Sequence, residues 1–109
     1  MNIEDIPFIN IDWNTQPSIE TKGDSGAAVT KEAKLGNIRL RRIDFSPNYS
    51  ADHWCSKGHI VTVLEGSLTT TLQSGQTHTT TAGNTFIVSD TIDPHHTHTA
   101  TGAKLLIID

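Results

Sequence analysis

The stretch Ile60-Val61-Thr62-Val63-Leu64-Glu65-Gly66-Ser67-Leu68-Thr69-Thr70-Thr71-Leu72 decides the fold class of this chain. Both of its arms are rich in apolar and β-branched residues, which favour pleated strands. Glu65-Gly66 separates the arms, and Gly66 can adopt the positive φ that a tight turn requires. The stretch therefore predicts a β-hairpin with strands over 60–64 and 67–72.

Strand and turn signals continue downstream of this hairpin. Ser74-Gly75 predicts a second turn, which leads into a strand over 76–81. Ala82-Gly83-Asn84 predicts a third turn, followed by a strand over 85–88. The apolar run at 104–108 is expected inside a sheet, because an apolar strand at a free edge would invite aggregation.

The N-terminal part of the chain gives shorter signals. Residues 8–13 and 27–32 are candidate strands, and 30–35 can also be interpreted as a short helix. The segment 38–45 alternates apolar and polar residues until Arg42 breaks the register, which predicts a β-bulge. Sixteen threonines, thirteen of them after residue 61, fit the same interpretation. The chain is therefore predicted to be all-β, an antiparallel barrel or sandwich.

Composition excludes several classes of protein. The 109 residues fit one domain, and eight Lys and Arg against twelve Asp and Glu give a net charge of −4. This charge argues against a partner that is nucleic acid or an anionic membrane. A single cysteine excludes an intramolecular disulfide. No apolar run approaches the roughly 18 residues of a membrane span, and no basic signal peptide opens the chain, so we expect a cytoplasmic protein.

All six histidines lie between residues 53 and 98, in two groups. In the first group His53, Cys55 and His59 share sequence parity, so on an extended chain they point to the same face. Imidazole and thiolate are good ligands for first-row metals. The second group, residues 94–98, can supply a further ligand from a neighbouring strand. Cys55 also fits a small buried side chain, which is the commoner role of a lone cysteine.

These residues resemble the first motif of the cupin superfamily. The family's hydrophobic strand ends in Val-Leu-Glu-Gly, and this chain has Val63-Leu64-Glu65-Gly66. Counting back from the glycine, the resemblance places the family's ligand glutamate on His59 and its His-x-His pair on His53 and Cys55.

The second cupin motif is matched only in part. It starts well at Gly83, but its histidine falls on Pro94, which cannot bind a metal. One inserted residue restores the histidine at His95, and His96 is the substitute if the insertion falls elsewhere. The resemblance covers about residues 36–109.

A bacterial subgroup of small cupin-fold proteins is also similar to this chain. Those proteins are usually named for an Asp-His-Cys-Trp ("DHCW") motif, and this chain has the order Asp52-His53-Trp54-Cys55. The resemblance implies one cupin domain over 1–109, with 1–35 as N-terminal strands or extension and 36–109 as the conserved barrel. The implied fold is a double-stranded β-helix of the jelly-roll type.

The resemblance also implies a divalent metal ion inside the barrel. A nitrogen and sulfur ligand set favours zinc, with iron(II) or nickel as alternatives. The implied ligands are His53, Cys55, His59 and His95.

Other polar residues surround these candidates in the sequence. Arg39 and Arg41 share a strand face, which favours outward solvated charge; if that face lines the barrel, they can bind an anionic substrate group. Asp52 is a candidate for orienting His53, or for capping a turn. The remaining histidines, His78 and His98, are expected on the surface.

The functional hypothesis is a small metal-binding cupin that binds or acts on a small oxygenated molecule at the metal. Dioxygenase, isomerase and lyase chemistry all occur on this barrel, and the fold does not choose among them. The alternatives are a non-catalytic barrel that binds a small ligand and a metal-free structural dimer. A homodimer is expected because an apolar N-terminal edge would need cover, formed by Phe8, Ile9, Ile11 and Trp13.

Overall fold

The computed structural model describes residues 2–109 and is nearly all-β. Within these residues there is no α-helix, and no helix has the length and apolar character needed to cross a membrane. One turn of 3-10 helix, η1 (Trp13–Thr15), precedes the strands. The strands are β1 (Ser18–Lys22), β2 (Ala27–Leu35), β3 (Ile38–Phe45), β4 (Tyr49–Ser50), β5 (His59–Leu72), β6 (Thr77–Thr81), β7 (Thr85–Val88), β8 (His95–Thr99) and β9 (Ala103–Ile108).

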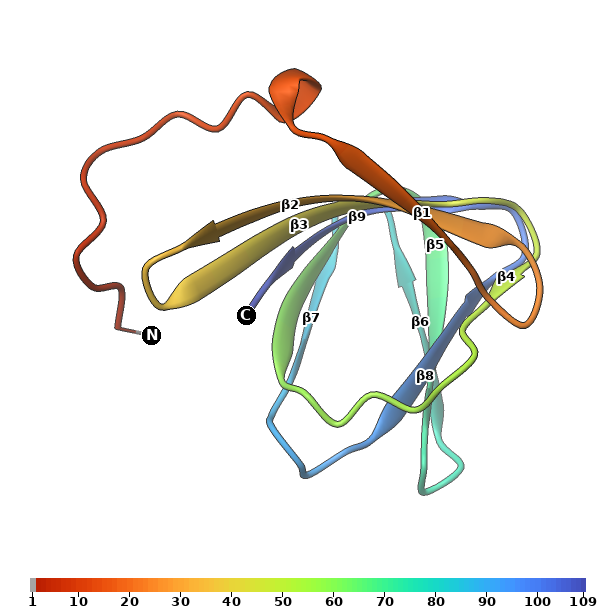
Figure 1. The fold of residues 1–109 in the computed structure, drawn as a ribbon. Helices are drawn as coiled ribbons and strands as arrows, with labels where there is room; N and C mark the ends of the chain where they lie inside the picture. Colours follow the sequence, from red (N-terminus) through yellow and green to blue (C-terminus); the bar gives the residue numbers. More distant parts are fainter. Residues whose placement is uncertain (1) are drawn as a thin grey trace.

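The strands form one antiparallel sheet that curls into a half-barrel (Figure 1). Their order is β1-β2-β3-β9-β5-β8-β4, and β6 and β7 also pair with β5. The first part of β5 pairs with β7 and β9, and its second part pairs with β6 and β8. Because β5 belongs to both halves of the curled sheet, its two ends contribute side chains to opposite walls. The expected all-β, antiparallel architecture is confirmed.

β5 itself differs from the prediction. The expected hairpin is a single strand of 14 residues, His59–Leu72, that runs straight through the turn signal. A register shift between Val63 and Glu65 marks a bulge, and Gly66 has φ of +78°. A Cβ at Gly66 would lie 2.2 Å from the carbonyl oxygen of Gly102, so the close approach of β9 requires glycine here. The glycine signal was therefore real, but it bends the strand and does not reverse it.

The downstream elements follow the sequence closely. Gly75 and Gly83 have φ of +100° and +89° in the turns before β6 and β7. β9 lies between β3 and β5, inside the sheet as expected.

Three upstream predictions are wrong. β3 pairs with β2 and β9 in unbroken register past Arg42, so there is no bulge there. The 30–35 segment belongs to strand β2 and is not a helix, because its backbone pairs with both β1 and β3. Residues 8–12 form no strand, and η1 begins at Trp13.

The core fills the inside of the curled sheet. Phe45 packs against this core and stacks on Tyr49, with the two ring centroids 4.2 Å apart. Polar side chains replace apolar ones toward one opening, where a cavity of about 370 Å³ lies. The buried core residues are Ala28, Ile43, Tyr49, Ala51, Val61, Val63, Leu68, Ala103, Leu105 and Ile107.

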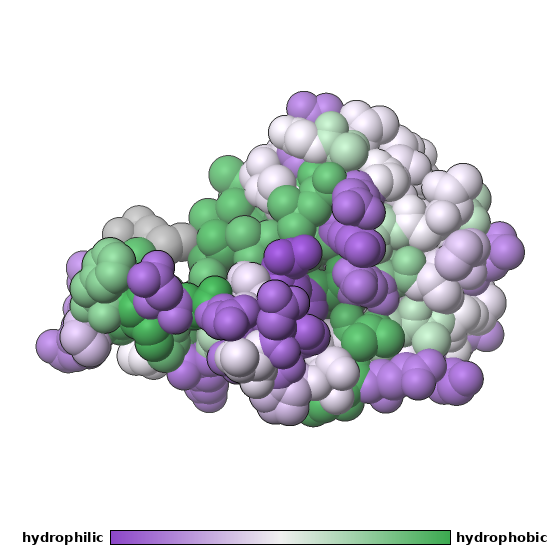
Figure 2. Space-filling view, turned by 90° about the horizontal axis from the view of Figure 1, so that it is seen from above, coloured by the Kyte–Doolittle hydropathy of each residue, from purple (hydrophilic) through white to green (hydrophobic). Residues whose placement is uncertain are grey.

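Residues 2–12 form an extended arm that leaves the sheet at η1 (Figure 1). The arm meets the β2–β3 turn again, where the backbone N–H of Glu4 donates to Oδ1 of Asn37 over 3.0 Å. Phe8 is 92% exposed, and hydrophobic side chains are visible on the left-hand lobe of the molecule in Figure 2. The predicted homodimer would cover such a surface, and it stays a prediction.

Candidate metal centre

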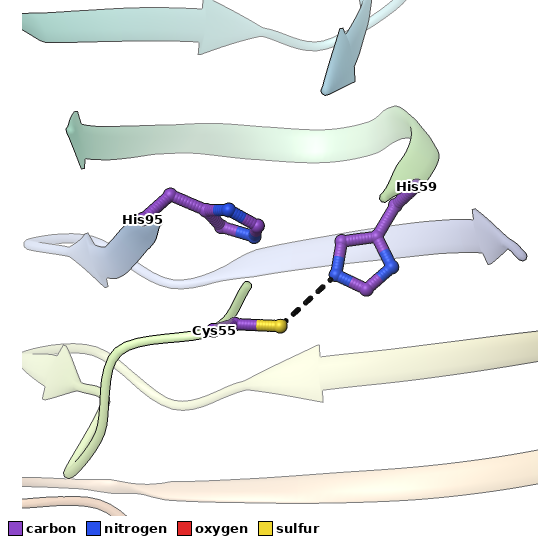
Figure 3. A group of neighbouring side chains, drawn as sticks. All are labelled: Cys55, His59 and His95. Carbon is purple, nitrogen blue, oxygen red and sulfur yellow. Dashed lines mark hydrogen bonds between the residues drawn. The ribbon is translucent and has the colours of Figure 1, made fainter. Parts of the chain in front are cut away.

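Three predicted ligands converge at the opening of the half-barrel. The donor atoms of Cys55, His59 and His95 all lie within 4.8 Å of one another (Figure 3). His59 is 8% exposed and His95 is 5% exposed. Within residues 2–109 this is the one group of three His, Cys, Asp or Glu residues with metal-site geometry.

Three different elements deliver the group. His59 is the first residue of β5 and points inward, like Val61 and Val63 further along that strand. His95 is the first residue of β8, which pairs with the other end of β5. Cys55 lies in a loop and forms an isolated antiparallel bridge with His95, with N–H···O distances of 2.8 and 2.9 Å. The bridge therefore holds the cysteine beside His95 without a regular strand.

The segment 51–58 is a loop, which corrects the argument from shared parity. The N–H of Gly58 donates to Oδ1 of Asp90 over 2.7 Å and directs the chain into β5. A loop does not keep alternate side chains on one face, so His53 is not in the group. Its side chain is 70% exposed and Nδ1 lies 2.7 Å from Oδ1 of Asp52. Because His53 still lines the 370 Å³ cavity, it stays a predicted ligand.

A buried carboxylate orients His59. Nδ1 of His59 lies 2.8 Å from Oδ2 of Asp109, and Nε2 lies 3.4 Å from Sγ of Cys55. Donation from Nδ1–H to the carboxylate leaves the Nε2 lone pair free for a metal, as in carboxylate–histidine–metal arrangements. Burial lowers the pKa of His59 below its usual value, although the hydrogen bond to Asp109 opposes this. His59 is thus neutral at neutral pH, the form that binds metals.

Two arginines hold Asp109 in turn. Nε and Nη2 of Arg39 donate to its two carboxylate oxygens over 2.9 and 3.0 Å, and Nη2 of Arg41 donates to Oδ2 over 3.1 Å. Burial alone would raise the pKa of Asp109, but hydrogen bonds from Arg39 and His59 hold it well below its usual range. Both arginines line the cavity of about 370 Å³. The expectation of outward solvated charge is therefore wrong.

Asp109 is the residue that the sequence analysis missed. It follows β9, and its backbone exchanges hydrogen bonds of 2.7 and 2.9 Å with Arg39 on β3. Its side chain is only 3% exposed. The available signal was two arginines on one face of β3, which require a carboxylate if that face is buried.

The structure separates the two candidate histidines of the second motif. The ring of His95 meets that of His59 edge-on with centroids 5.3 Å apart, and its Nδ1 lies 3.2 Å from the carbonyl oxygen of Asp93. His96 turns to the other side of β8, where it contacts Trp54 and the carbonyl of Ala51. His95 therefore joins the group and His96 does not.

Several solved structures share this arrangement of strands. A sugar phosphate isomerase of the cupin superfamily from Silicibacter pomeroyi matches 92% of this chain and 74% of its own, with a TM-score of 0.73 and 15% identity. The polyketide cyclase RemF from Streptomyces resistomycificus matches 94% of this chain and 78% of its own, with a TM-score of 0.73 and 19% identity.

A third match is the crystal structure of Fe(II)-HppE with an alternative substrate, at a TM-score of 0.76 and 15% identity over 96% of this chain and 62% of its own. This chain has the cupin fold. No family model matches the sequence, and no curated protein matches it. At these identities the comparisons establish the cupin fold alone, and the resemblance to the Asp-His-Cys-Trp subgroup stays a prediction.

The donor set of this cupin barrel fits a transition metal. Two imidazoles and one thiol match the ligand preferences of zinc and of iron(II). Three protein donors leave at least one coordination position for another ligand, which is the arrangement of catalytic sites. The Cys55, His59 and His95 group could therefore hold a metal ion.

Proposed function

We propose that this cupin binds one divalent transition metal ion through Cys55, His59 and His95 and presents it to a small oxygen-bearing molecule. The observation that carries the proposal is the convergence of three donor atoms within 4.8 Å at the wall of a cavity of about 370 Å³. This volume is near the lower end of the roughly 300–1,000 Å³ typical of small-molecule sites.

Each residue near the group has a distinct task in this proposal. Nε2 of His59 would bind the ion, while its Nδ1–H donates a hydrogen bond to Asp109 that fixes the ring and its tautomer. Cys55 binds as the thiolate and supplies the one negative charge of the ligand set. His53 lies at the same cavity and is the candidate for a fourth ligand. A bound ion would supply Lewis acidity and an open position for a substrate oxygen.

The metal itself is part of the proposal. The sulfur donor favours zinc over harder ions, and iron(II) or nickel would also accept this set. The cupin-fold HppE carries Fe(II) in its structure, which supports iron as the main competitor.

A second candidate is a barrel that holds a small molecule without converting it. Among the described residues that line the cavity, none is an aspartate or a glutamate, so a carboxylate general base is missing from its wall. The missing carboxylate favours binding over chemistry that needs a carboxylate base. Chemical identification of any molecule that co-purifies, followed by incubation with the metal-loaded protein, separates the two candidates.

Elemental analysis of protein purified without a histidine tag tests the metal proposal. We expect about one zinc or iron ion per chain in the wild type, and loss of that ion in His59→Ala after dialysis against a mild chelator. His78→Ala is the matched control, because His78 is exposed on β6 and outside the group. Stoichiometric metal in dialysed His59→Ala would show that the ion binds elsewhere.

A further inference from the structure

The cavity at the metal centre concentrates positive charge. Arg39, Arg41 and Lys57 line it, and the wall formed by the described residues contains no carboxylate. The whole chain has the opposite balance, with a net charge of −4. The cations at this cavity therefore run against the composition of the chain, which points to a negatively charged ligand.

The two arginines of β3 are used differently by the protein. Arg39 forms two hydrogen bonds to Asp109, and its Nη1 lies 3.5 Å from Oε1 of Glu32. Arg41 gives one hydrogen bond, from Nη2 to Asp109. Its Nε is buried and has no hydrogen-bond partner among the described residues. Arg39 thus makes two of the three arginine hydrogen bonds to Asp109, whereas most donors of Arg41 have no partner among residues 2–109.

Charge around Arg41 is also incompletely balanced. The single carboxylate of Asp109 is shared by Arg39, Arg41 and His59. Burial and the neighbouring Arg39 lower the pKa of Arg41 below its ordinary value, although a guanidinium stays charged at neutral pH. A divalent ion with only one thiolate ligand would add further positive charge to the same cavity.

The rest of the wall is mostly apolar. Apolar side chains reach the cavity from several strands, and Tyr49 and three threonines add hydroxyl groups. A wall of this kind binds a hydrocarbon body, with a few polar groups that fix its orientation. The apolar side chains include Val61, Leu68, Phe86 and Leu105.

We propose that the ligand of this cavity is a small organic carboxylate and that Arg41 is the residue that recognises its charge. The inference rests on the proposed function, since it names the substrate class of the same site. One guanidinium with unused donors matches a planar carboxylate, to which it can donate two parallel hydrogen bonds. A small cavity with a mostly apolar wall favours such a monoanion with a hydrocarbon body over a doubly charged phosphate ester.

Binding of benzoate and of benzamide, its neutral analogue of the same shape, tests this inference. Both are titrated into zinc-loaded protein and into chelator-treated protein, and binding is followed by NMR through the chemical shifts of the protein. We expect the wild type to bind benzoate about tenfold more tightly than benzamide, because charge-assisted hydrogen bonds are about twice as strong as neutral ones. Arg41→Gln should remove this preference, and Arg41→Lys should keep part of it.

Arg42→Gln is the matched control. Arg42 is the next residue of β3 and lies on the opposite face, near Trp13 and Asp44. We expect it to keep the full preference for benzoate. Zinc content is measured in every variant, and Arg41→Gln should retain the ion because Arg39 still holds Asp109.

The outcomes separate this inference from the metal proposal. No detectable benzoate binding, equal binding of the two probes, or an undiminished preference in Arg41→Gln overturns the inference. A wild type that binds no zinc but keeps an Arg41-dependent preference overturns the metal proposal and supports the inference. If Arg41→Gln or Arg41→Lys is unfolded by circular dichroism, the other variant carries the test.

Discussion

Two cavities share the side chain of Phe86 and differ in the residues that surround their buried polar side chains. The first, of about 370 Å³, has the metal-ligand group at its wall. The second, of about 530 Å³, opens between β6 and β7 and is lined by Thr70, His78 and Asp93. Each contains a buried polar side chain from the inner face of β5: His59 is 8% exposed and Thr70 is 5% exposed.

The difference lies in what converges on those two side chains. His59 meets Sγ of Cys55 and the carboxylate of Asp109, which come from a loop and from the end of β9. Oγ1 of Thr70 has no hydrogen-bond partner in residues 2–109. His78 also lines the second cavity, but within residues 2–109 it belongs to no group of candidate metal ligands. Histidine content alone therefore does not make a metal centre; the meeting of several elements does.

Asp109→Asn should have the largest effect, a loss of metal affinity at the first cavity. Loss of the carboxylate removes the partner that fixes the tautomer of His59, and such outer-shell losses typically cost about 10–100-fold in metal affinity. Competition with a chromophoric chelator measures the change. Glu32→Gln is the control, because Glu32 contacts Arg39 at the surface and not Asp109. Unchanged zinc affinity in Asp109→Asn would contradict the assigned role of the carboxylate.

Acid should destabilise the metal-free protein through the same residue. The pKa of Asp109 is lowered in the folded state, chiefly by Arg39 and His59 acting against the effect of burial. Its contribution to stability is therefore fully present above the unfolded pKa of about 3.9 and is lost as the pH falls below that value. Urea unfolding in the presence of chelator should show a shallower decline with acid in Asp109→Asn than in the wild type. Parallel pH profiles would argue against this linkage.

Thr70→Val tests the second region and should have the smallest effect. Valine has nearly the same shape and removes a buried hydroxyl without a partner, so we expect the free energy of unfolding to rise by about 1 kcal/mol. Thr99→Val is the matched comparison, because Oγ1 of Thr99 donates to Ser67 over 2.7 Å and accepts from the N–H of Gly102 over 3.1 Å. The free energy of unfolding of Thr99→Val should fall by about 1–3 kcal/mol. Destabilisation by Thr70→Val would show that its hydroxyl is satisfied after all.

The sequence predicts the strands better than the connections between them. Local composition identified the β6, β7 and β9 segments, because glycine turns and β-branched runs are short-range signals. The same local logic turned Glu65-Gly66 into a hairpin turn, although β5 continues through it as a bulge. Whether a glycine reverses a strand or only bends it depends on its neighbours, here the close backbone of Gly102.

The candidate site shows the same limit. The motif resemblance pointed to His59 and His95, and both belong to the group that could hold a metal ion. His53 and Cys55 were both predicted from the same motif and from parity along an extended strand. That segment is a loop, and the structure brings Cys55 into the group and leaves His53 outside it. Asp109 was out of reach, because its link to His59 joins residues 50 positions apart and depends on the pairing of β3 with β9.

X-ray absorption spectroscopy of the metal-loaded protein identifies the atoms bound to the ion and therefore examines the proposed metal centre itself. With zinc, we expect one sulfur at about 2.3 Å together with imidazole nitrogens at about 2.0–2.1 Å. In Cys55→Ser the sulfur shell should disappear while the imidazole scattering remains. A wild-type spectrum with only nitrogen and oxygen neighbours, or without imidazole scattering, would contradict a metal centre built from Cys55, His59 and His95.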